Sequence, residues 1–385
     1  MINIDGHYVI QRLENNKKKN QNQNDNNNQP TTIIVFTARK YSIEYVFKSH
    51  STANVIITLL RQFFPQKGTA SQPKGFMWDR KDDLWMLLKT LYIEIELLLE
   101  REYKCQLVYS PCYIIGDIHG NIEDLMSMEN SLWRQMPYMV SASYLFLGDY
   151  VDRGKWGFEC VLYLIAFKLL CPNKVTLLRG NHEVRSIQRH YSYYQECLFK
   201  YGEVIGLKVW HLTNKIFDRL PVCAVLDDAI YCAHGGIPRS TSNIEQIRER
   251  VPRILFNPQN QSAIAWEILW SDPCTLRWFV DICEQKNIDP EAQSGYIFNV
   301  RRGTAFLFNE TGAIDFLRSN ALTHIIRAHE VAQNGYEFHF GTKCVTIFSS
   351  SHYCGNENDC GLILADNQRL RVIILDTVNN ASATD

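Results

Sequence analysis

A long uncharged hydrophobic run is missing from the 385 residues of this sequence. The nearest candidate, residues 84–99, is interrupted by charges such as Lys89 and Glu94, so it is too polar to span a bilayer. Its pattern instead predicts a helix that is capped by Asp82 or Asp83 and packs on a sheet. The N-terminus also lacks a basic region followed by an apolar stretch, which argues against a secretory leader. No membrane contact is therefore expected.

Cysteine pairs and strong charge are scarce as well. The twelve cysteines include no Cys-x-x-Cys pair, and 46% of the residues are hydrophobic, so we expect reduced thiols around an ordinary core. The net charge is −1 and the one basic block is residues 17–19, so nucleic acid is not an expected partner. EF-hand patterns and 34-residue repeats are absent, which argues against a built-in calcium or repeat module. The expected location is the cytoplasm, with the nucleus as a second possibility.

Composition divides the chain into an extension, one large domain and a tail. Residues 1–50 form the extension, and its Asn/Gln-rich run at residues 15–29 is too polar to build a core. Residues 51–377 are the predicted folded domain, followed by a short tail at residues 378–385. The domain is expected to begin with an amphipathic helix at residues 53–64, capped by Ser51 or Thr52. Further strands are expected at residues 32–37, 345–348 and 370–375.

Five polar motifs, each placed directly after a short apolar run, are the main positive signal. The motifs are Gly116-Asp117-Ile118-His119-Gly120, Gly148-Asp149-Tyr150-Val151-Asp152-Arg153-Gly154, Gly180-Asn181-His182-Glu183, His234-Gly235-Gly236 and Arg327-Ala328-His329. The runs before them, at residues 112–115, 144–147, 175–178, 230–233 and 325–326, favour strands. One such motif alone could be a turn with a helix-capping aspartate. Five in order favour a shared site, because loops at the carboxyl ends of strands converge on one crevice.

The residue types in these motifs suit two divalent metal ions. The predicted ligands are Asp117, His119, Asp149, Asn181, His234 and His329. Asp149 is the candidate bridge, because a shared carboxylate lets two ions lie ~3.5–4 Å apart. Asp117 and His119 would then face one ion, and the other three residues would complete the second. Water held between two dications is acidified, so hydroxide can serve as the nucleophile at neutral pH.

Cleavage of a phosphate ester also needs cationic groups and an acid. Arg153 and Arg302 are the candidates for binding phosphate, because a guanidinium group binds two phosphate oxygens at once. His182 is the candidate acid for the leaving oxygen, and Asp152 is the candidate residue that orients it.

With these motifs, the chain resembles the phosphoprotein phosphatases, the metal-dependent serine/threonine phosphatases close to type 1 and type 2A, over about residues 83–377. Further matching stretches are Leu178-Arg179-Gly180, Leu220-Pro221, Leu269-Trp270-Ser271-Asp272-Pro273, Arg302-Gly303, Arg327-Ala328-His329-Glu330, Gly335-Tyr336-Glu337-Phe338 and Tyr353-Cys354-Gly355. The resemblance implies an α/β fold of the calcineurin-like metallophosphoesterase type, with a central two-sheet sandwich flanked by helices. It implies hydrolysis of phosphoserine and phosphothreonine esters by a hydroxide that bridges two metal ions, manganese in vitro and iron or zinc in the cell. It also places Asn181 and Tyr353 beside the substrate phosphate.

The chain departs from this family at several places. The loop at residues 349–358 around Tyr353 differs, and an insertion at residues 274–294 could border the cleft and narrow the choice of substrates. Phosphoprotein substrates are expected, and a regulatory subunit is a further possible partner. The groove through which type-1 enzymes bind such subunits is only partly matched, because Phe338 is kept but His324 replaces an apolar position.

Two other functions stay open at this point. A different phosphoesterase with the same fold, such as a dinucleoside polyphosphate hydrolase, would share the metal motifs. A scaffold that keeps the fold but binds without catalysis is the other alternative. Outside the motifs, we expect ordinary structural or surface roles for His190, His211, His352 and Cys354, and salt bridges or cleft positions for Arg179 and Arg185.

Overall fold

The computed structural model describes residues 51–64, 75–134, 139–366 and 368–375. The predicted extension at residues 1–50, the strand expected at residues 32–37 and the predicted tail lie outside these ranges. The described helices are α1 Thr52–Phe63, α2 Lys81–Leu99, α3 Ile122–Leu132, α4 Gly157–Leu170, α5 Arg185–His190, α6 Tyr193–Phe217, α7 Ile244–Arg250, α8 Pro258–Gln261, α9 Ala263–Trp270, α10 Leu276–Gln285 and α11 Glu310–Ser319. None of the helices in these ranges combines the length and the apolar character that a bilayer-spanning helix needs.

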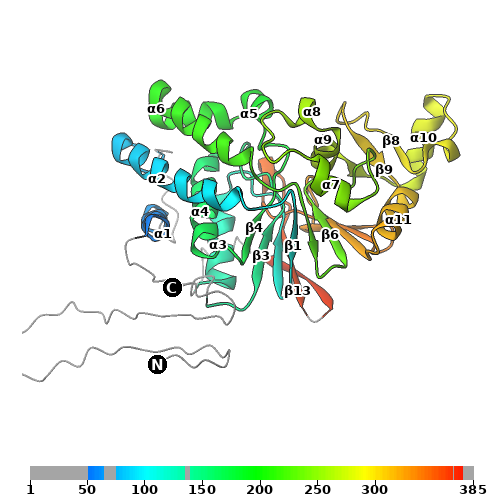
Figure 1. Ribbon diagram of the computed structural model, residues 1–385, viewed down its shortest axis with the longest axis horizontal. Helices are drawn as coiled ribbons and strands as arrows, with labels where there is room; N and C mark the ends of the chain where they lie inside the picture. Colours follow the sequence, from blue (N-terminus) through cyan, green and yellow to red (C-terminus); the bar gives the residue numbers. More distant parts are fainter. Residues whose placement is uncertain (1–50, 65–74, 135–138, 367, 376–385) are drawn as a thin grey trace, which may run out of the picture.

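Two large sheets lie in the middle of the molecule (Figure 1). One has the order β14-β13-β2-β3-β4, with β14 Arg369–Leu375, β13 Cys360–Asp366, β2 Cys112–Ile115, β3 Ser143–Phe146 and β4 Val175–Leu177. The other has the order β1-β5-β6-β10-β12-β11, with β1 Cys105–Val108, β5 Cys223–Leu226, β6 Ile230–Ala233, β10 His324–Arg327, β12 Cys344–Ile347 and β11 Tyr336–His339. A small third sheet, β7-β9-β8, is built from Asp272–Pro273, Phe306–Phe308 and Tyr296–Phe298.

Alternating side chains of the two large sheets form one apolar layer between them. Ile114 of β2 and Ile363 of β13 belong to the same buried cluster as Leu226 of β5 and Val345 of β12. Successive residues of a strand point to opposite faces, so the other face of each sheet is left for helices. The predicted two-sheet sandwich flanked by helices is confirmed.

Helices cover both outer faces of this sandwich (Figure 1). The largest buried cluster joins the sheet that contains β2, β3 and β4 to α1–α4 and α6, and a second cluster joins the other sheet to α7, α9 and α11. The helix expected at residues 53–64 is confirmed as α1, and the Oγ of Ser51 accepts the N–H of Asn54 as its cap.

The expectation for residues 84–99 was right about the helix and wrong about its surroundings. Helix α2 begins at Lys81 after Arg80, whose side chain makes no capping hydrogen bond, while Asp82 and Asp83 lie in the first turn. Acidic groups there still favour the positive end of the helix. Its buried residues pack mainly against α6, α1 and α4 rather than on a sheet. The apolar period identifies a buried face but carries no information about which element covers it.

Candidate active site

The five motifs lie at the ends of five strands, and all five strands end at the same edge of the sandwich. Strands β2, β3 and β4 run parallel in one sheet, and β6 and β10 run parallel in the other. Asp117 follows β2 and His329 follows β10, and the N–H of His329 donates to Oδ1 of Asp117 at 3.0 Å. Residues that are 212 positions apart are thereby joined across the two sheets.

Left-handed backbone is concentrated in these loops. His119, Asp149 and His329 have φ values of 48°, 53° and 69°, and Asp152 and Arg153 have 68° and 71°. Such conformations cost residues other than glycine of order 1–3 kcal/mol each and cluster at functional sites. The loops are therefore held in place by their surroundings.

The loops after β3 and β4 approach each other closely at two glycines. A Cβ on Gly148 would lie 2.4 Å from the backbone nitrogen of Gly180, and a Cβ on Gly180 would lie 2.2 Å from Oδ1 of Asp149. Glu183 fixes the same contact, because its buried carboxylate accepts the backbone N–H groups of Asp149, Tyr150 and Gly180 at 2.8–2.9 Å. This brings Asp149 beside the Asn181-His182 turn.

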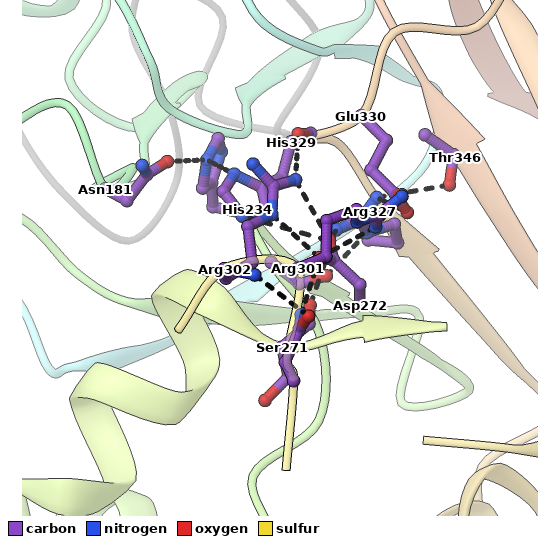
Figure 2. Close-up of polar contacts among 12 residues, drawn as sticks. Asn181, His234, Ser271, Asp272, Arg301, Arg302, Arg327, His329, Glu330 and Thr346 are labelled. Carbon is purple, nitrogen blue, oxygen red and sulfur yellow. Dashed lines mark hydrogen bonds and ion pairs between the residues drawn. The ribbon is translucent and has the colours of Figure 1, made fainter. Parts of the chain in front are cut away.

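Four atoms with lone pairs meet around His234. Its Nε2 lies 2.8 Å from Oδ1 of Asn181 and 3.1 Å from Nδ1 of His329 (Figure 2), and it lies 3.3 Å from Oδ2 of Asp149. All four residues are at least nine-tenths buried. One ring proton cannot satisfy so many acceptors, and rotating the Asn181 amide would instead turn its NH₂ toward them. A cation satisfies all four atoms at once, so this donor set fits a divalent metal ion.

A second group lies on the other side of Asp149. Nε2 of His119 is 3.5 Å from Oδ2 of Asp149 and 3.5 Å from Oδ2 of Asp117. Among the His, Cys, Asp and Glu residues of the described ranges, the sets whose candidate ligand atoms all lie within 4.8 Å of one another are His119, Asp149 and His182, and Asp149, His234 and His329. Asp149 belongs to both, as the predicted bridge requires. The first set contains His182, which the sequence assigns to acid catalysis rather than to a metal.

Burial and neighbouring charges shift the pKa values of the candidate metal ligands. Burial alone would raise the pKa of Asp149, but His234, His182 and His119 hold this pKa far below its usual range. Burial would likewise lower the pKa of His119, yet Asp117 and Asp149 raise it to about 9. Burial and the nearby Arg302 lower the pKa of His329 well below its usual value, so that imidazole stays neutral. The ionised Asp149 and the neutral His329 are therefore in the forms that bind metal, whereas His119 would release its proton when an ion binds.

His182 and Asp152 form the predicted pair. Nδ1 of His182 lies 2.7 Å from Oδ2 of Asp152, and Nε2 lies 4.0 Å from Oδ2 of Asp149. The other oxygen of Asp152 accepts the N–H groups of Ser192 and Tyr193 at 3.0 and 2.6 Å, at the start of α6. Because Nδ1 is engaged by the carboxylate, Nε2 is the ring atom that remains for a substrate in the cavity.

A cavity of about 370 Å³ contains most of the predicted site residues. Its lining includes Asp117, His119, Asp149, Asn181, His182, His329, Arg153, Arg302 and Tyr353, together with Tyr191, Trp270, Arg301, Glu330, Val331 and Phe348. Asp152 and His234 are not in the lining and lie behind it, in contact with His182 and Asn181. The structure therefore brings together every residue that the sequence assigned to the site.

The two predicted phosphate-binding arginines are held in different ways. The guanidinium group of Arg153 lies 4.1 Å from the ring centre of Tyr191, and no ion pair to it is found among the described residues. Arg302 donates from Nε to Asp272 at 2.9 Å and from Nη2 to the carbonyl of His329 at 3.0 Å (Figure 2). The ring of Tyr353 lies 5.0 Å from that of His119.

Asp272 is an organising residue for which no role was predicted. It is fully buried, and its carboxylate accepts hydrogen bonds from Arg301, Arg302 and Arg327 (Figure 2), and from Asn299. These arginines hold its pKa at about 2 against the opposing effect of burial. Its position in the Trp270-Ser271-Asp272-Pro273 stretch was visible in the sequence, but its partners are up to 55 residues away.

The residues for which structural or surface roles or salt bridges were expected lie in such positions in the structure. His190, His211 and His352 are exposed, and Arg179 and Arg185 form ion pairs with Asp218. All twelve cysteines are free, and only Cys354 is exposed among them.

Comparison with known proteins agrees with this geometry. The model of the calcineurin-like phosphoesterases matches residues 110–333, which is more than half of the chain. The chain belongs to this family. It is 36% identical to a catalytic subunit of protein phosphatase 2A from Dictyostelium discoideum over 74% of this chain and 82% of that protein. It is 35% identical to the serine/threonine-protein phosphatase PP2A-like PPG1 of Saccharomyces cerevisiae, over 69% and 68% of the two chains.

A solved structure supports the same assignment. A serine/threonine phosphatase from Saccharomyces cerevisiae with similarity to human phosphatase PP5 superposes with a TM-score of 0.62 at 25% identity, covering 75% of this chain and 89% of that one. Within the calcineurin-like phosphoesterases, the chain is thus a member of the metal-dependent serine/threonine protein phosphatases, as the resemblance of its motifs implied.

Proposed function

We propose that this phosphatase hydrolyses phosphoserine and phosphothreonine esters of proteins at a site for two divalent metal ions. The observation that carries the proposal is the shared cavity, which joins two metal-binding sets through Asp149 and places His182, Arg153 and Arg302 around them. The names of the relatives, which are serine/threonine-protein phosphatases, support the same substrate class.

Each group has a part in this reaction. When bound, two divalent cations supply acidified water and neutralise charge on the phosphoryl group. Asp117, His119, Asp149, Asn181, His234 and His329 are the residues that would hold them. Manganese suits the carboxylate and amide oxygens, and iron or zinc suits the imidazoles.

The remaining residues act on the substrate. Arg153 and Arg302 bind phosphoryl oxygens from two walls of the cavity, with Asn181 and Tyr353 beside them. His182 donates a proton from Nε2 to the serine or threonine oxygen as the P–O bond breaks. Asp152 holds Nδ1 of the same ring and stabilises its charged form.

The direct test is phosphate release from a phosphothreonine peptide by the purified protein supplied with manganese. We expect release that depends on metal and is lost in Asp149→Asn, which keeps the shape of the side chain but removes the bridging charge. Diadenosine polyphosphate is the competing substrate in the same assay. Faster turnover of that compound than of the peptide would replace this proposal with the other phosphoesterase.

A further inference from the structure

Arg301 lies next to a phosphate-binding residue and has no role in the reaction described so far. It lines the same cavity as Arg302, and 47% of its side chain is exposed. Within the described part of the chain, its side-chain hydrogen bonds all start from one nitrogen, Nη2, which donates to Asp272 at 3.0 Å and to Glu330. The other donors of its guanidinium group are left for a ligand.

The backbone around Arg301 is fixed by Asn299. This side chain is fully buried, donates from Nδ2 to Asp272 at 2.9 Å and accepts the N–H of Arg302 at 3.2 Å. The N–H of Gly303 donates to the carbonyl of Asn299 at 2.9 Å, and Gly303 has a φ of 68°. The turn between β8 and β9 therefore presents two arginines in a fixed arrangement, which lowers the entropy lost when a ligand binds.

The cluster around Asp272 contains more cationic than anionic side chains. Arg301, Arg302 and Arg327 are the guanidinium groups, and Asp272 and Glu330 are the carboxylates that pair with them (Figure 2). Arg327 is fully buried, so Arg301 and Arg302 are the two that face the cavity. An anion can therefore bind here without displacing either carboxylate.

The insertion at residues 274–294 reaches this cluster. It contains α10, whose Phe279, Ile282 and Cys283 form a small core with Ile297 of β8 and Leu307 of β9. This packing holds Trp278 so that the guanidinium carbon of Arg301 lies 5.4 Å from its ring centre. A cation over a tryptophan face is stabilised by about 0.5–1 kcal/mol at an exposed site. The segment predicted to be an insertion thus supports Arg301.

We propose that Arg301, supported by Trp278, forms a second anion subsite that selects phosphoproteins with an acidic group close to the phosphorylated residue. The inference rests on the proposed function, because it needs Arg302 to hold the reacting phosphate. Nη2 of Arg301 and Nε of Arg302 contact the same oxygen of Asp272 at 3.0 and 2.9 Å, so they lie no further apart than the sum of these distances. Side chains two positions apart in an extended peptide point to the same face, so they can reach both.

The test compares matched phosphothreonine peptides that differ at one position. Alanine, aspartate or phosphoserine is placed in turn at each of the two positions on either side of the phosphothreonine, and kcat/KM is measured with the manganese-loaded protein. At one position or more, we expect the acidic peptides to be preferred about 5-fold over alanine at low salt, the size of effect that one exposed charge pair gives. The gain should lie mostly in KM, because the contact exists before and during the chemical step. The aspartate and phosphoserine arms separate a carboxylate from a second phosphate as the preferred group.

Variants show whether Arg301 causes the preference. In Arg301→Gln the ratio between acidic and alanine peptides should fall to about 1, Arg301→Lys should keep part of it, and Trp278→Leu should lower it. Arg318→Gln, which removes an arginine from an exposed ion pair on α11, is the matched control and should keep the wild-type ratio. Metal content and thermal unfolding of each variant show whether it folds.

Salt gives a check that needs no variant. The preference of the wild-type protein should disappear toward 1 M salt, where exposed charges are screened within about 3 Å. If Arg301→Gln slows all peptides by the same factor, Arg301 is only a structural partner of Glu330 and the inference is wrong. Release from the alanine peptide with no acidic preference overturns this inference alone, whereas no release from any peptide overturns the proposed function as well.

Discussion

His182 has two candidate roles, the acid and a metal ligand, and they predict different effects of replacing it. Its Nε2 lies 4.0 Å from Asp149, close enough to belong to a metal-binding set, while its Nδ1 is engaged by Asp152 at 2.7 Å. We expect His182→Ala to lower kcat by about 10²–10⁴-fold, the usual effect of losing an acid, with metal content nearly unchanged. Metal analysis of the purified variant decides the point, because a protein that loses an ion would make His182 a ligand.

A second prediction at the scale of the residue concerns Asp124, which is not one of the candidate metal ligands. Its buried carboxylate accepts the N–H of Ser351 at 2.5 Å and the hydroxyl of Ser351 at 2.9 Å, and so ties α3 to the loop of Tyr353. Burial raises the pKa of Asp124 to about 6, above the value of about 3.9 in an unfolded chain. The folded state therefore holds this proton more tightly.

The sign of the pH effect follows from that proton. The stability linked to Asp124 is fully present below pH ~4 and is lost as the pH rises through about 6. Asp124→Asn, which cannot titrate, should therefore cost more stability at pH 4.5 than at pH 7, by up to about 2 kcal/mol. Urea unfolding of both proteins at the two pH values measures the difference. Asp315→Asn on exposed α11 is the control and should show no such trend; an equal cost of Asp124→Asn at both pH values would contradict the assignment.

At the scale of elements, a buried ionic cluster joins α4 to α6. Nζ of Lys200 lies 2.5 Å from Glu159 and 2.7 Å from Glu196, and Glu196 also accepts the N–H groups of Gly157 and Phe158 at the start of α4. Helix α4 follows the loop of Asp149 and Arg153, so this cluster fixes where that loop ends.

Lys200→Met should destabilise the protein by about 3–5 kcal/mol, because two buried carboxylates lose their counter-charge. Lys208→Met on the same helix removes an exposed lysine and should cost less than about 1 kcal/mol. Thermal unfolding of both variants gives the comparison. Adding Glu196→Gln to Lys200→Met should recover part of the loss, and failure to recover any would mean that the charge is not the cause.

The elements also show what the sequence could predict. Strands β2 and β6 were predicted with their observed bounds, and the predicted and observed starts of β3 differ by one residue, because short β-branched runs before Gly or His motifs are a local signal. The partners of α2 were predicted wrongly, since a helical period does not name the covering element. Helix α10 was not predicted within residues 274–294, although it supports the cluster around Arg301.

In the site as well, local motifs could be predicted from the sequence, whereas contacts between distant residues could not. Residues of defined chemistry in motifs, such as Asp149 and His182, could be assigned from the sequence because their type and order indicate one reaction. Glu183 and Asp272 lie in stretches that the sequence shows, but their contacts with groups 34 and 55 positions away do not follow from those stretches, and Asn299 lies in no motif. No role was predicted for Arg301, because only the fold shows that it faces the same cavity as Arg302.

At the scale of the whole molecule, the site joins the two sheets of the sandwich. Asp117, Asp149 and Asn181 follow strands of one sheet, and His234 and His329 follow strands of the other. A metal ion that binds the folded state alone stabilises it, by about 2.7 kcal/mol when its free concentration is 100 times the Kd.

Removing metal with a chelator should therefore lower the unfolding temperature, and adding manganese back should restore it. In Asp149→Asn the temperature should respond little to manganese, because the residue shared by both sets has lost its charge. Asp315→Asn, with an equal change of charge on α11, is the control and should respond like the wild type. Calorimetry with and without metal measures all three proteins. If manganese restores phosphate release but leaves the unfolding temperature unchanged, the ions do not hold the two sheets together, and the fit of the four atoms around His234 to a cation would need another explanation.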